Sequence, residues 1–414
     1  MKILISAYAC EPGAGSEYGV GWMVPTTMAR RYPDCSVYVL TRSRCRAKIE
    51  EALKQLNLPN LCFLFYDIPH WLTYEKEMQS RWGEQINYLW WQWLVRGFVR
   101  KQQKVHGFDV IHHLTFNQYR TPSPGFFLDI PFVMGPIGGA ELVNPVFWPD
   151  LGKHTLRKER LRQNGKDLKV LGWMCRWRKN RKLILCSCQE NKERMSKYVN
   201  PAVLQVMPAI GYSTDDFPPV QSEQTGETFE MLYAGKAWDW KGIHIYLKAV
   251  RRAFLDRGVT NFRVLLVGIR FEEEQIRVTN WVKELNLTEQ VTLIPFVNRS
   301  ELLKMEANSH LAVYPAFRDS GSMSVLEACA LGCPSICFDA GGQDVFPDDV
   351  VLKVPVGPTY EETLRHFAEK LRWAYEHPDE TKRMGQSARN WVADHLTWDS
   401  KVDDFMKIYQ TLIG

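Results

Sequence analysis

Short apolar runs recur along the first half of the chain, and stretches long enough to form helices separate most of them. The runs are KILISAY, SVYVLT, LCFLFYDI, DVIHHLTF, PFVMGPI, LILCSC and VLQVMPAI, all within residues 2–210. Fully apolar strands that alternate with helices are typical of a parallel sheet covered on both faces. The pattern therefore predicts an α/β domain.

A second series of apolar runs follows a polar stretch, STDDFPPVQSEQTGET, that is typical of a linker. These runs are EMLYAGKA, RVLLVGI, VTLIPFV, HLAVYPA, SICFDAG and VVLKVPV, and helical patterns close the chain at 360–376, 379–395 and 399–413. A chain of 414 residues is too long for one ordinary core. We predict two doubly wound, Rossmann-like domains that face a cleft. They span 1–212 and 229–395, joined by a linker at 213–228, and the C-terminal helix 396–414 crosses back to the first domain.

Composition limits the class of protein. The formal net charge of +5 is mild, and no apolar window is long enough to predict a membrane-spanning helix. The ten cysteines are scattered, with no CxxC pair and no histidine at metal-ligand spacing. We therefore expect free thiols, no bound metal and a cytoplasmic location.

The first strand leads into AYACEPGAGSEYGVGW, residues 7–22. The glycines Gly13 and Gly15 permit close backbone approach, Ser16 is a suitable helix N-cap, and Glu17 would lie in the first helical turn. The stretch is compatible with a phosphate-cradling loop or with a simple strand-to-helix turn. It lacks the third glycine of a dinucleotide fingerprint, which disfavours a Rossmann dehydrogenase.

The densest cluster of polar groups lies in YPAFRDSGSMSVLEACALGCPSICFDAGG, residues 314–342. Asp319 falls in a loop, and Glu327 lies about one turn inside a helix predicted to begin near 322–324. The amides of Gly321, Ser322 and Met323 would be free donors at that helix N-terminus, where an anion can bind. The alternative is an N-capping aspartate and a solvated helical glutamate.

A second polar stretch, YAGKAWDWKG, spans residues 233–242. Lys236 and Lys241 lie in a strand-to-helix loop, where Gly235 and Gly242 allow close approach. Two cations in such a loop suit a diphosphate. A solvated surface loop is the alternative.

Together these stretches resemble the retaining glycosyltransferases of family 4, which have the GT-B fold. That family carries an acidic residue, seven intervening residues and a glutamate, here Asp319 and Glu327, and a Gly-Arg (or Lys)…Lys-Gly loop, here Gly235-Lys236…Lys241-Gly242. MPAIGYSTDDF and LEACALGCPSICFDAGG also match. The opening loop, RTPSP and GPIGGAE are similar to one branch with an N-terminal CEPGxGSE loop. The chain departs from the family in having Asp319 instead of glutamate and Lys236 instead of arginine.

The resemblance implies roles for these residues in transfer from a nucleotide-sugar donor. Lys236 and Lys241 would bind the diphosphate, Glu327 the ribose hydroxyls, and Asp319 a hydroxyl of the transferred sugar. The departing phosphate oxygen would take the acceptor's proton on the same face, so that configuration is retained. No metal or other cofactor is required. Gly13 and Gly15 would bring backbone close to the sugar and β-phosphate.

On the first domain, the resemblance points to a histidine near the transferred sugar. We favour His113 over its neighbour His112, and since alternate strand residues face opposite sides, one of the two is expected to be packed in the core. Further candidates for acceptor or sugar contacts follow in sequence order: Glu11, Glu17, Arg120 and Glu141.

Two segments combine basic and aromatic residues. Residues 87–105 include three tryptophans beside four basic residues, and 153–182 contain twelve Lys or Arg with two tryptophans, against Glu159 and Asp167. This composition predicts contact with an anionic membrane surface, and hence a saccharide or lipid-linked saccharide acceptor, as in cell-surface polysaccharide assembly. The alternative is a solvated basic face with tryptophans in the core. No nucleic-acid-binding module is visible.

Two other functions stay compatible with the residues. A sugar-nucleotide epimerase with the same fold would act without a saccharide acceptor. A non-catalytic sugar-nucleotide-binding protein would bind the donor without hydrolysing or transferring it.

Overall fold

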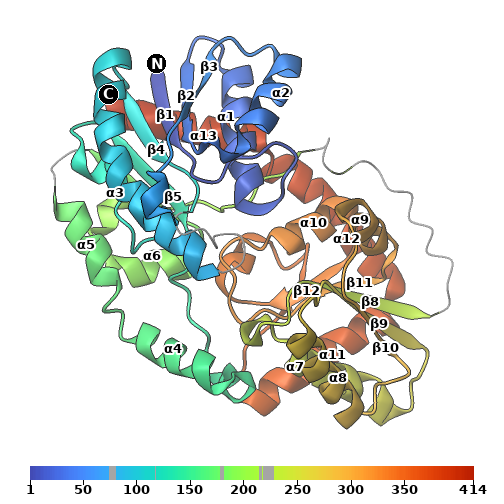
Figure 1. Cartoon of the computed structure of the whole chain (residues 1–414). Coiled ribbons are helices and arrows are strands. Elements are labelled where there is room, and N and C mark those ends of the chain that lie inside the picture. The colour runs from blue at the N-terminus through green and yellow to red at the C-terminus, as the bar shows by residue number, and fades with distance from the viewer. Residues whose placement is uncertain (74–80, 117, 178–180, 214–216, 218–227) are drawn as a thin grey trace. The chain divides into compact units, whose positions relative to one another are not determined.

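The computed structural model describes residues 1–73, 81–116, 118–177, 181–213, 217 and 228–414, which form two compact units (Figure 1). Unit 1 comprises Met1–Ala140, Gly165–Gly211 and Trp398–Gly414, and unit 2 comprises Glu141–Asn164 and Tyr212–Thr397. Most of the predicted linker 213–228 lies outside the described residues. The sequence analysis placed 141–164 in the first domain, but the structure assigns this segment to unit 2. The reason is that its apolar residues Val143, Phe147 and Leu151 belong to the unit 2 core.

Unit 1 is built on a parallel sheet of order β3-β2-β1-β4-β5-β6-β7. Its strands coincide with the predicted apolar runs, and along β1 the alternate residues Ile3 and Ile5 enter one core layer while Leu4 enters the other. The strands are β1 Lys2–Ser6, β2 Ser36–Thr41, β3 Leu61–Phe65, β4 Val110–His113, β5 Phe132–Ile137, β6 Lys182–Cys186 and β7 Leu204–Val206.

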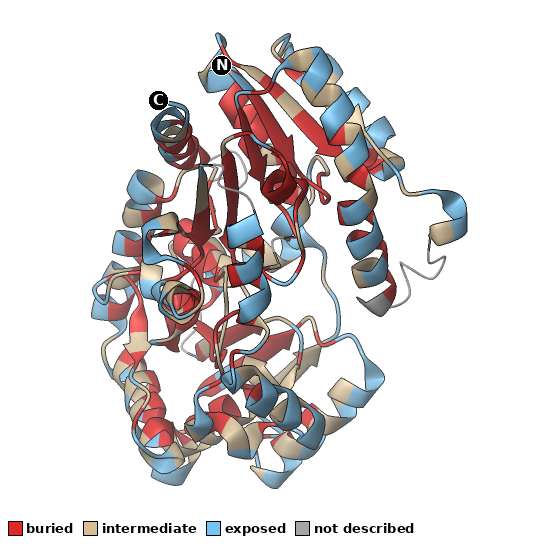
Figure 2. Ribbon diagram, turned by 90° about the vertical axis from the view of Figure 1, so that its left-hand side faces the viewer, coloured by how far each residue is buried: buried red, intermediate tan, exposed pale blue. Residues whose placement is uncertain are grey.

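Helices cover both faces of this sheet. One layer contains α3, α5 and α6, and the other contains α1, α2 and the C-terminal helix α13. Figure 2 shows the strands buried and the helices exposed along their outer sides. The bounds are α1 Ser16–Arg31, α2 Arg46–Leu56, α3 Arg81–His106, α5 Leu168–Trp177, α6 Gln189–Ser196 and α13 Trp398–Ile413. None of the described helices is both long and apolar enough to span a membrane.

Unit 2 repeats the same plan with a parallel sheet of order β10-β9-β8-β11-β12-β13. These strands again coincide with the predicted second series of apolar runs. They are β8 Phe229–Ala234, β9 Phe262–Val267, β10 Val291–Ile294, β11 Leu311–Tyr314, β12 Ser335–Phe338 and β13 Leu352–Val354.

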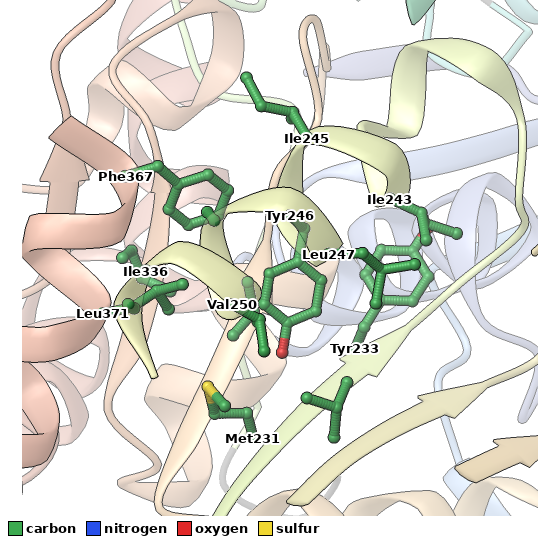
Figure 3. Close-up of a cluster of buried hydrophobic side chains, with 14 of the residues drawn as sticks. Met231, Tyr233, Ile243, Ile245, Tyr246, Leu247, Val250, Ile336, Phe367 and Leu371 are labelled. Carbon is green, nitrogen blue, oxygen red and sulfur yellow. The ribbon is translucent and has the colours of Figure 1, made fainter. Parts of the chain in front are cut away.

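The main core layer of unit 2 lies between its sheet and α7. Figure 3 shows Tyr246 and Val250 of α7 between Met231 of β8 and Phe367 of α11. A smaller cluster that includes Leu232 lies on the opposite face, beneath α9. The helices are α4 Lys153–Gln163, α7 Ile243–Ala253, α8 Glu272–Glu284, α9 Arg299–Asn308, α10 Met323–Leu331, α11 Tyr360–Glu376 and α12 Pro378–His395.

Both sheets reverse their strand order at one point, between β1 and β4 in unit 1 and between β8 and β11 in unit 2. In open parallel sheets, ligands bind at the carboxyl ends of the strands beside such a reversal. The predicted fold class, two doubly wound Rossmann-like domains, is confirmed. A ligand site of unit 2 is therefore expected at the loops after β8 and β11.

Candidate functional site

The loops after β8 and β11 touch backbone to backbone. The amide of Phe317 donates to the carbonyl of Trp240 at 2.8 Å. Gly242 ends the first loop in the left-handed region, with φ +70°, and a Cβ there would lie 1.9 Å from the carbonyl oxygen of Pro315. The close approach requires glycine, because any side chain at this position would displace the second loop.

Lys241 and Asp319 join the two loops through an ion pair. The Lys241 Nζ lies 2.7 Å from Asp319 Oδ2, and each side chain is about one quarter exposed. Asp319 Oδ1 accepts the amides of Gly321 at 3.1 Å and Ser322 at 3.2 Å. Burial raises the pKa of Asp319, but Lys241 and the two amides outweigh it and hold the pKa below its ordinary value. The expectation that these two amides are free is wrong, since the Asp319 carboxylate occupies both.

Ser322 carries a strained backbone and an unpartnered hydroxyl. Its φ of 44° and ψ of 34° are left-handed, which costs a non-glycine residue about 1 kcal/mol. Its Oγ is buried, with no hydrogen-bond partner among the described residues. Ser322 lines a cavity of about 70 Å³ together with Tyr233, Lys241 and Asp319. A buried hydroxyl without a partner, beside an ion pair, suits a polar ligand group.

A larger cavity of about 480 Å³ adjoins the smaller one, and Ala234, Gly235 and Ser324 line both. Lys236, Arg270, Phe296 and Glu327 are among the residues that line the larger one. The Arg270 guanidinium lies 4.3 Å from the Phe296 ring centroid, and the exposed Lys236 extends its Nζ over Trp238. The volume lies within the range typical of small-molecule sites.

Glu327 lies inside α10 as predicted, and it is not the solvated residue of the alternative interpretation. Its side chain is largely buried, and Oε1 pairs with Arg299 Nη1 at 2.5 Å. Behind it lies Glu306, which the sequence analysis missed because nothing in its local sequence reveals complete burial. Tyr314 donates its hydroxyl to Glu306 Oε1 at 2.8 Å, and burial together with the charge of Glu327 raises the pKa of Glu306 to about 8.

Glu306 gives unit 2 a pH-dependent stability. An acid with a raised folded-state pKa stabilises the protein fully only below its unfolded pKa. That contribution is lost as pH rises from the ordinary 4.5 through the folded value of about 8. We expect Glu306→Gln, a neutral isostere, to exceed the unaltered protein in unfolding free energy by on the order of 1 kcal/mol at pH 8.5. This difference in unfolding free energy, measured by urea unfolding, should become smaller toward pH 5. A difference independent of pH would exclude this account of Glu306.

The two strand histidines of unit 1 are both completely buried, on opposite sides of β4. His112 bonds Tyr409 of α13 and the carbonyl of Gly135. His113 Nε2 lies 3.0 Å from the Tyr88 hydroxyl and Nδ1 lies 3.3 Å from Ser6 Oγ. Burial lowers the pKa of His113 to about 3, so the ring is neutral at pH 7. These contacts favour a packing role for both, whereas the sequence analysis expected one of them to reach the donor.

The remaining candidates of unit 1 have protein partners. Glu11 pairs with Lys48, and this hydrogen bond lowers the pKa of Glu11, while its Oε2 lies 3.3 Å from Cys45 Sγ. Arg120 Nε donates to Asp167 at 3.0 Å. Glu17 lies in the first turn of α1 as predicted, and its carboxylate accepts a hydrogen bond from the backbone amide of Phe116, while burial raises its pKa to about 7.

The glycines of the opening loop are placed differently from one another. Gly13 has φ +70° with open space around its Cβ position. Gly15, not Ser16, is the residue that caps α1, because the helix begins at Ser16, one residue earlier than predicted.

Glu141, the fourth acceptor candidate, is buried and belongs to unit 2, where its carbonyl accepts from Arg162. Unit 1 has its own cavity of about 360 Å³, lined by residues that include Tyr8, Arg42, Asp67 and Trp91. The buried Arg42 donates to the hydroxyls of Tyr8 and Tyr18. The position of Arg42 in the sequence could have revealed this site, since Arg42 directly follows the apolar run SVYVLT and so lies at the carboxyl end of its strand.

Residues 216–391 match the family model described as glycosyl transferases group 1. Solved structures of glycosyltransferases superpose over almost the whole chain. Sucrose-phosphate synthase from Thermosynechococcus elongatus has a TM-score of 0.64 and 17% identity, covering 99% of this chain and 98% of that one. WaaG, a glycosyltransferase involved in lipopolysaccharide biosynthesis, has a TM-score of 0.61 and 15% identity, covering 97% and 99%. The fold is that of a GT-B glycosyltransferase.

Curated relatives of this GT-B chain are also glycosyltransferases. The D-inositol 3-phosphate glycosyltransferase of Pseudarthrobacter chlorophenolicus is 27% identical over 115 residues, which are 28% of this chain and 27% of the relative. The MMP alpha-(1->4)-mannosyltransferase of Mycolicibacterium hassiacum is 23% identical over 218 residues, which are 52% and 50% of the two chains. The matches thus span from about a quarter to half the length of these relatives.

The segment that matches the glycosyltransferase family model contains the four charged residues of the predicted donor site. The structure brings Lys241 and Asp319 into contact and puts Lys236 and Glu327 at the adjoining cavity. Among the described residues, no cluster of three or more His, Cys, Asp or Glu side chains could hold a metal ion. None of the ten cysteines forms a disulfide.

Proposed function

We propose that this GT-B protein is a retaining glycosyltransferase that moves a sugar from a nucleotide-sugar donor to a saccharide or lipid-linked saccharide acceptor. The observation that carries the proposal is the pair of adjoining cavities at the sheet reversal of unit 2. One holds the Lys241–Asp319 pair and the unpartnered Ser322 hydroxyl, and the other holds Glu327. Such a donor needs cations that bind its diphosphate, an acidic side chain that holds a hydroxyl of the sugar, and a carboxylate that accepts hydrogen bonds from the ribose hydroxyls.

The nucleoside fits the larger cavity. Glu327, oriented by Arg299, accepts hydrogen bonds from the ribose hydroxyls, and the base lies toward Phe296. The diphosphate then lies at Gly235, where the two cavities adjoin, within reach of Lys236 and Lys241. Two solved structures of the same fold, both of Anabaena HepE, contain UDP, one of them with glucose. UDP is therefore the first nucleotide to test.

The chemistry follows from the charges of this site. As the bond between the sugar carbon and the phosphate oxygen breaks, negative charge develops on the diphosphate, and the two lysines stabilise it. The sugar becomes oxocarbenium-like, and Asp319 holds one of its hydroxyls. The departing phosphate oxygen takes the proton of the acceptor hydroxyl, which attacks from the same face, so that configuration is retained. Lysines supply the charge that a metal supplies elsewhere, so we expect EDTA to leave the rate unchanged.

The test is product analysis with labelled UDP-, GDP-, ADP- and dTDP-sugars, with and without saccharide acceptors. Transfer with the anomeric configuration of the donor, read by NMR, supports the proposal. An inverted product would contradict retention. Epimerised sugar formed without acceptor would identify an epimerase, and binding without hydrolysis or transfer would identify a non-catalytic protein.

We further propose that unit 1 contacts an anionic membrane through an aromatic–basic surface on α3 and α5. This surface consists of the exposed residues Trp90, Trp93, Arg100, Lys169, Trp173, Arg176 and Trp177, with the partly exposed Arg96. Phe127 contacts both Trp93 and Trp177, so the two helices present their tryptophans side by side. The third tryptophan of 87–105, Trp91, is in the core. The predicted basic segment 153–182 is divided between the two units, because its helix α4 belongs to unit 2.

The aromatic–basic surface predicts binding to vesicles. Trp93 and Trp177 are 45% and 52% exposed, and side chains of this kind bury their rings at a lipid interface. We expect the protein to float with phosphatidylglycerol vesicles at low salt and not with phosphatidylcholine vesicles. Trp93→Ala/Trp177→Ala should reduce flotation at least about fivefold, whereas Trp71→Ala, exposed elsewhere in unit 1, should not. Equal flotation of the double variant and the unaltered protein would refute the proposal that the aromatic–basic surface binds the membrane.

A further inference from the structure

Residues 141–164 form an arm that packs within unit 2, although they lie between two segments of unit 1 in the sequence. The arm contains a 3-10 helix, η4 Pro145–Asp150, followed by α4. Phe147 is fully buried and stacks on Phe317, with ring centroids 4.1 Å apart and planes at 11°. Phe317 lies in the loop after β11, two residues before Asp319, so the arm reaches the donor loops through its core contacts.

The arm also bonds directly to the loop after β8. Asp239 lies in that loop between Lys236 and Lys241, and its Oδ2 accepts the amide of Gly152 at 3.0 Å and the hydroxyl of Thr155 at 2.8 Å. Its other oxygen pairs with Arg277 of α8 at 3.4 Å. The N-terminal end of α4 thus fixes the carboxylate in the middle of the lysine loop.

A second contact fixes the loop after β11. Glu159 of α4 is almost completely buried, and its Oε1 lies 3.1 Å from Arg318 Nη2. Arg318 directly precedes Asp319. The Glu159 carboxylate also pairs with Arg162 at 3.6 Å and accepts the amide of Val143 at 3.3 Å. Removing this buried anion would remove the ion pair between Glu159 and Arg318, which is costly in a buried site.

The base of the arm is held separately. Asp150 is buried and accepts from Tyr360 of α11 at 2.8 Å, and it pairs with His244 at 2.9 Å and Lys248 at 3.5 Å, both on α7. Because these partners belong to the core helices of unit 2, the arm has a fixed base. The arm can therefore hold the loop after β8, which carries Lys236 and Lys241, and the loop after β11, which carries Asp319.

We propose that the arm is a positioning element for the diphosphate site, with Thr155 and Glu159 as positioning residues. Thr155 positions the loop after β8 through its hydrogen bond to Asp239, and Glu159 positions the loop after β11 through its ion pair with Arg318. The inference rests on the proposed function only for the identity of what the loops bind. That the arm orders the loops is a separate physical claim, which can be measured without ligand.

The test compares Thr155→Val and Glu159→Gln, which preserve shape, with Arg157→Ala, an exposed residue of the same helix. For the full chain, dissociation constants are measured for UDP, GDP and ADP and for the matching monophosphates. Each positioning variant should weaken binding of the diphosphate about tenfold and of the monophosphate little, since in the proposed placement the β-phosphate is the group that contacts both loops. Arg157→Ala should change neither. If a substitution only lowered the stability of the protein, the folded variant would keep the same ratio of the dissociation constants for the diphosphate and the monophosphate as the unaltered protein.

Hydrogen exchange of the unliganded variants separates the possible failures. Faster exchange of amides 236–242 and 318–322 is expected in both positioning variants, with the exchange of α7 and α11 unchanged. If no nucleotide binds the unaltered protein but these loops exchange faster in the variants, the proposed function fails and the arm remains a positioning element. Unchanged exchange in both loops, or an unchanged diphosphate-to-monophosphate ratio, would overturn the arm's role.

Discussion

Replacing Lys241 with methionine is expected to lower the rate of sugar transfer by about a hundredfold to a thousandfold. Methionine is similar in length to lysine but carries no charge. The Lys241 Nζ lies 2.7 Å from Asp319, and Lys241 lines the smaller cavity, so in the proposed mechanism the substitution removes the cation closest to the reacting end of the donor. Negative charge on the departing diphosphate then develops without this partner.

The loss should fall mainly on kcat, because the charge that Lys241 stabilises is greatest in the transition state. Steady-state kinetics with the active donor measures this directly. Lys304→Met, an exposed lysine of α9 in the same unit, serves as the matched control and should change neither constant. A Lys241→Met enzyme with the unaltered kcat would show that the cation plays no part in the reaction.

Gly242→Ala is expected to destabilise unit 2 by about 3 kcal/mol or more and to abolish nucleotide binding. The new Cβ would lie 1.9 Å from the Pro315 carbonyl oxygen, a backbone atom that cannot move without displacing the Asp319 loop. The left-handed conformation adds about 1 kcal/mol of strain. The two effects act together at the junction of both loops.

Gly258→Ala provides the control for strain alone. Gly258 has φ +75°, nearly the same as Gly242, but nothing lies within 4 Å of its Cβ position. Its substitution should cost only about 1 kcal/mol in urea unfolding and leave nucleotide binding intact. If both alanine substitutions lower the free energy of unfolding by the same amount, the close approach of the Pro315 carbonyl to Gly242 does not contribute to the stability of unit 2.

The strands and the charged cluster were predictable from local sequence. Most residues of apolar runs such as SVYVLT and RVLLVGI are buried, whichever face of the sheet they lie on, so hydrophobicity alone reveals these strands. Lys241 and Asp319 are 78 positions apart, yet both follow predicted strands, and the carboxyl ends of strands share one edge of a parallel sheet. Their contact therefore follows from topology.

The contacts of the arm could not be predicted in this way. Glu159 lies among lysines and arginines and reads as part of a solvated basic face, whereas the structure buries it against Arg318. The same applies to Glu306, whose burial depends on Tyr314 and on the packing of α9. Sequence periodicity reports whether a residue is apolar. It does not report which distant partner makes the burial of a charge tolerable.

The loop amides are an error of another kind. Gly321 and Ser322 were expected to have free amides because they precede a helix, but Asp319 accepts both. A short acidic side chain two or three residues before an amide can turn back onto it. In the unliganded protein the carboxylate thus occupies the groups that the sequence suggested for an anion.

The central claim is that the loops after β8 and β11 form one nucleotide-sugar site. Hydrogen exchange of the full chain with and without UDP, GDP or ADP tests it most directly. We predict that the nucleotide that binds slows exchange in 235–242 and in 319–324 together, with α12 unaffected. Binding that protects neither loop, or no binding of any of the three nucleotides, would contradict the account.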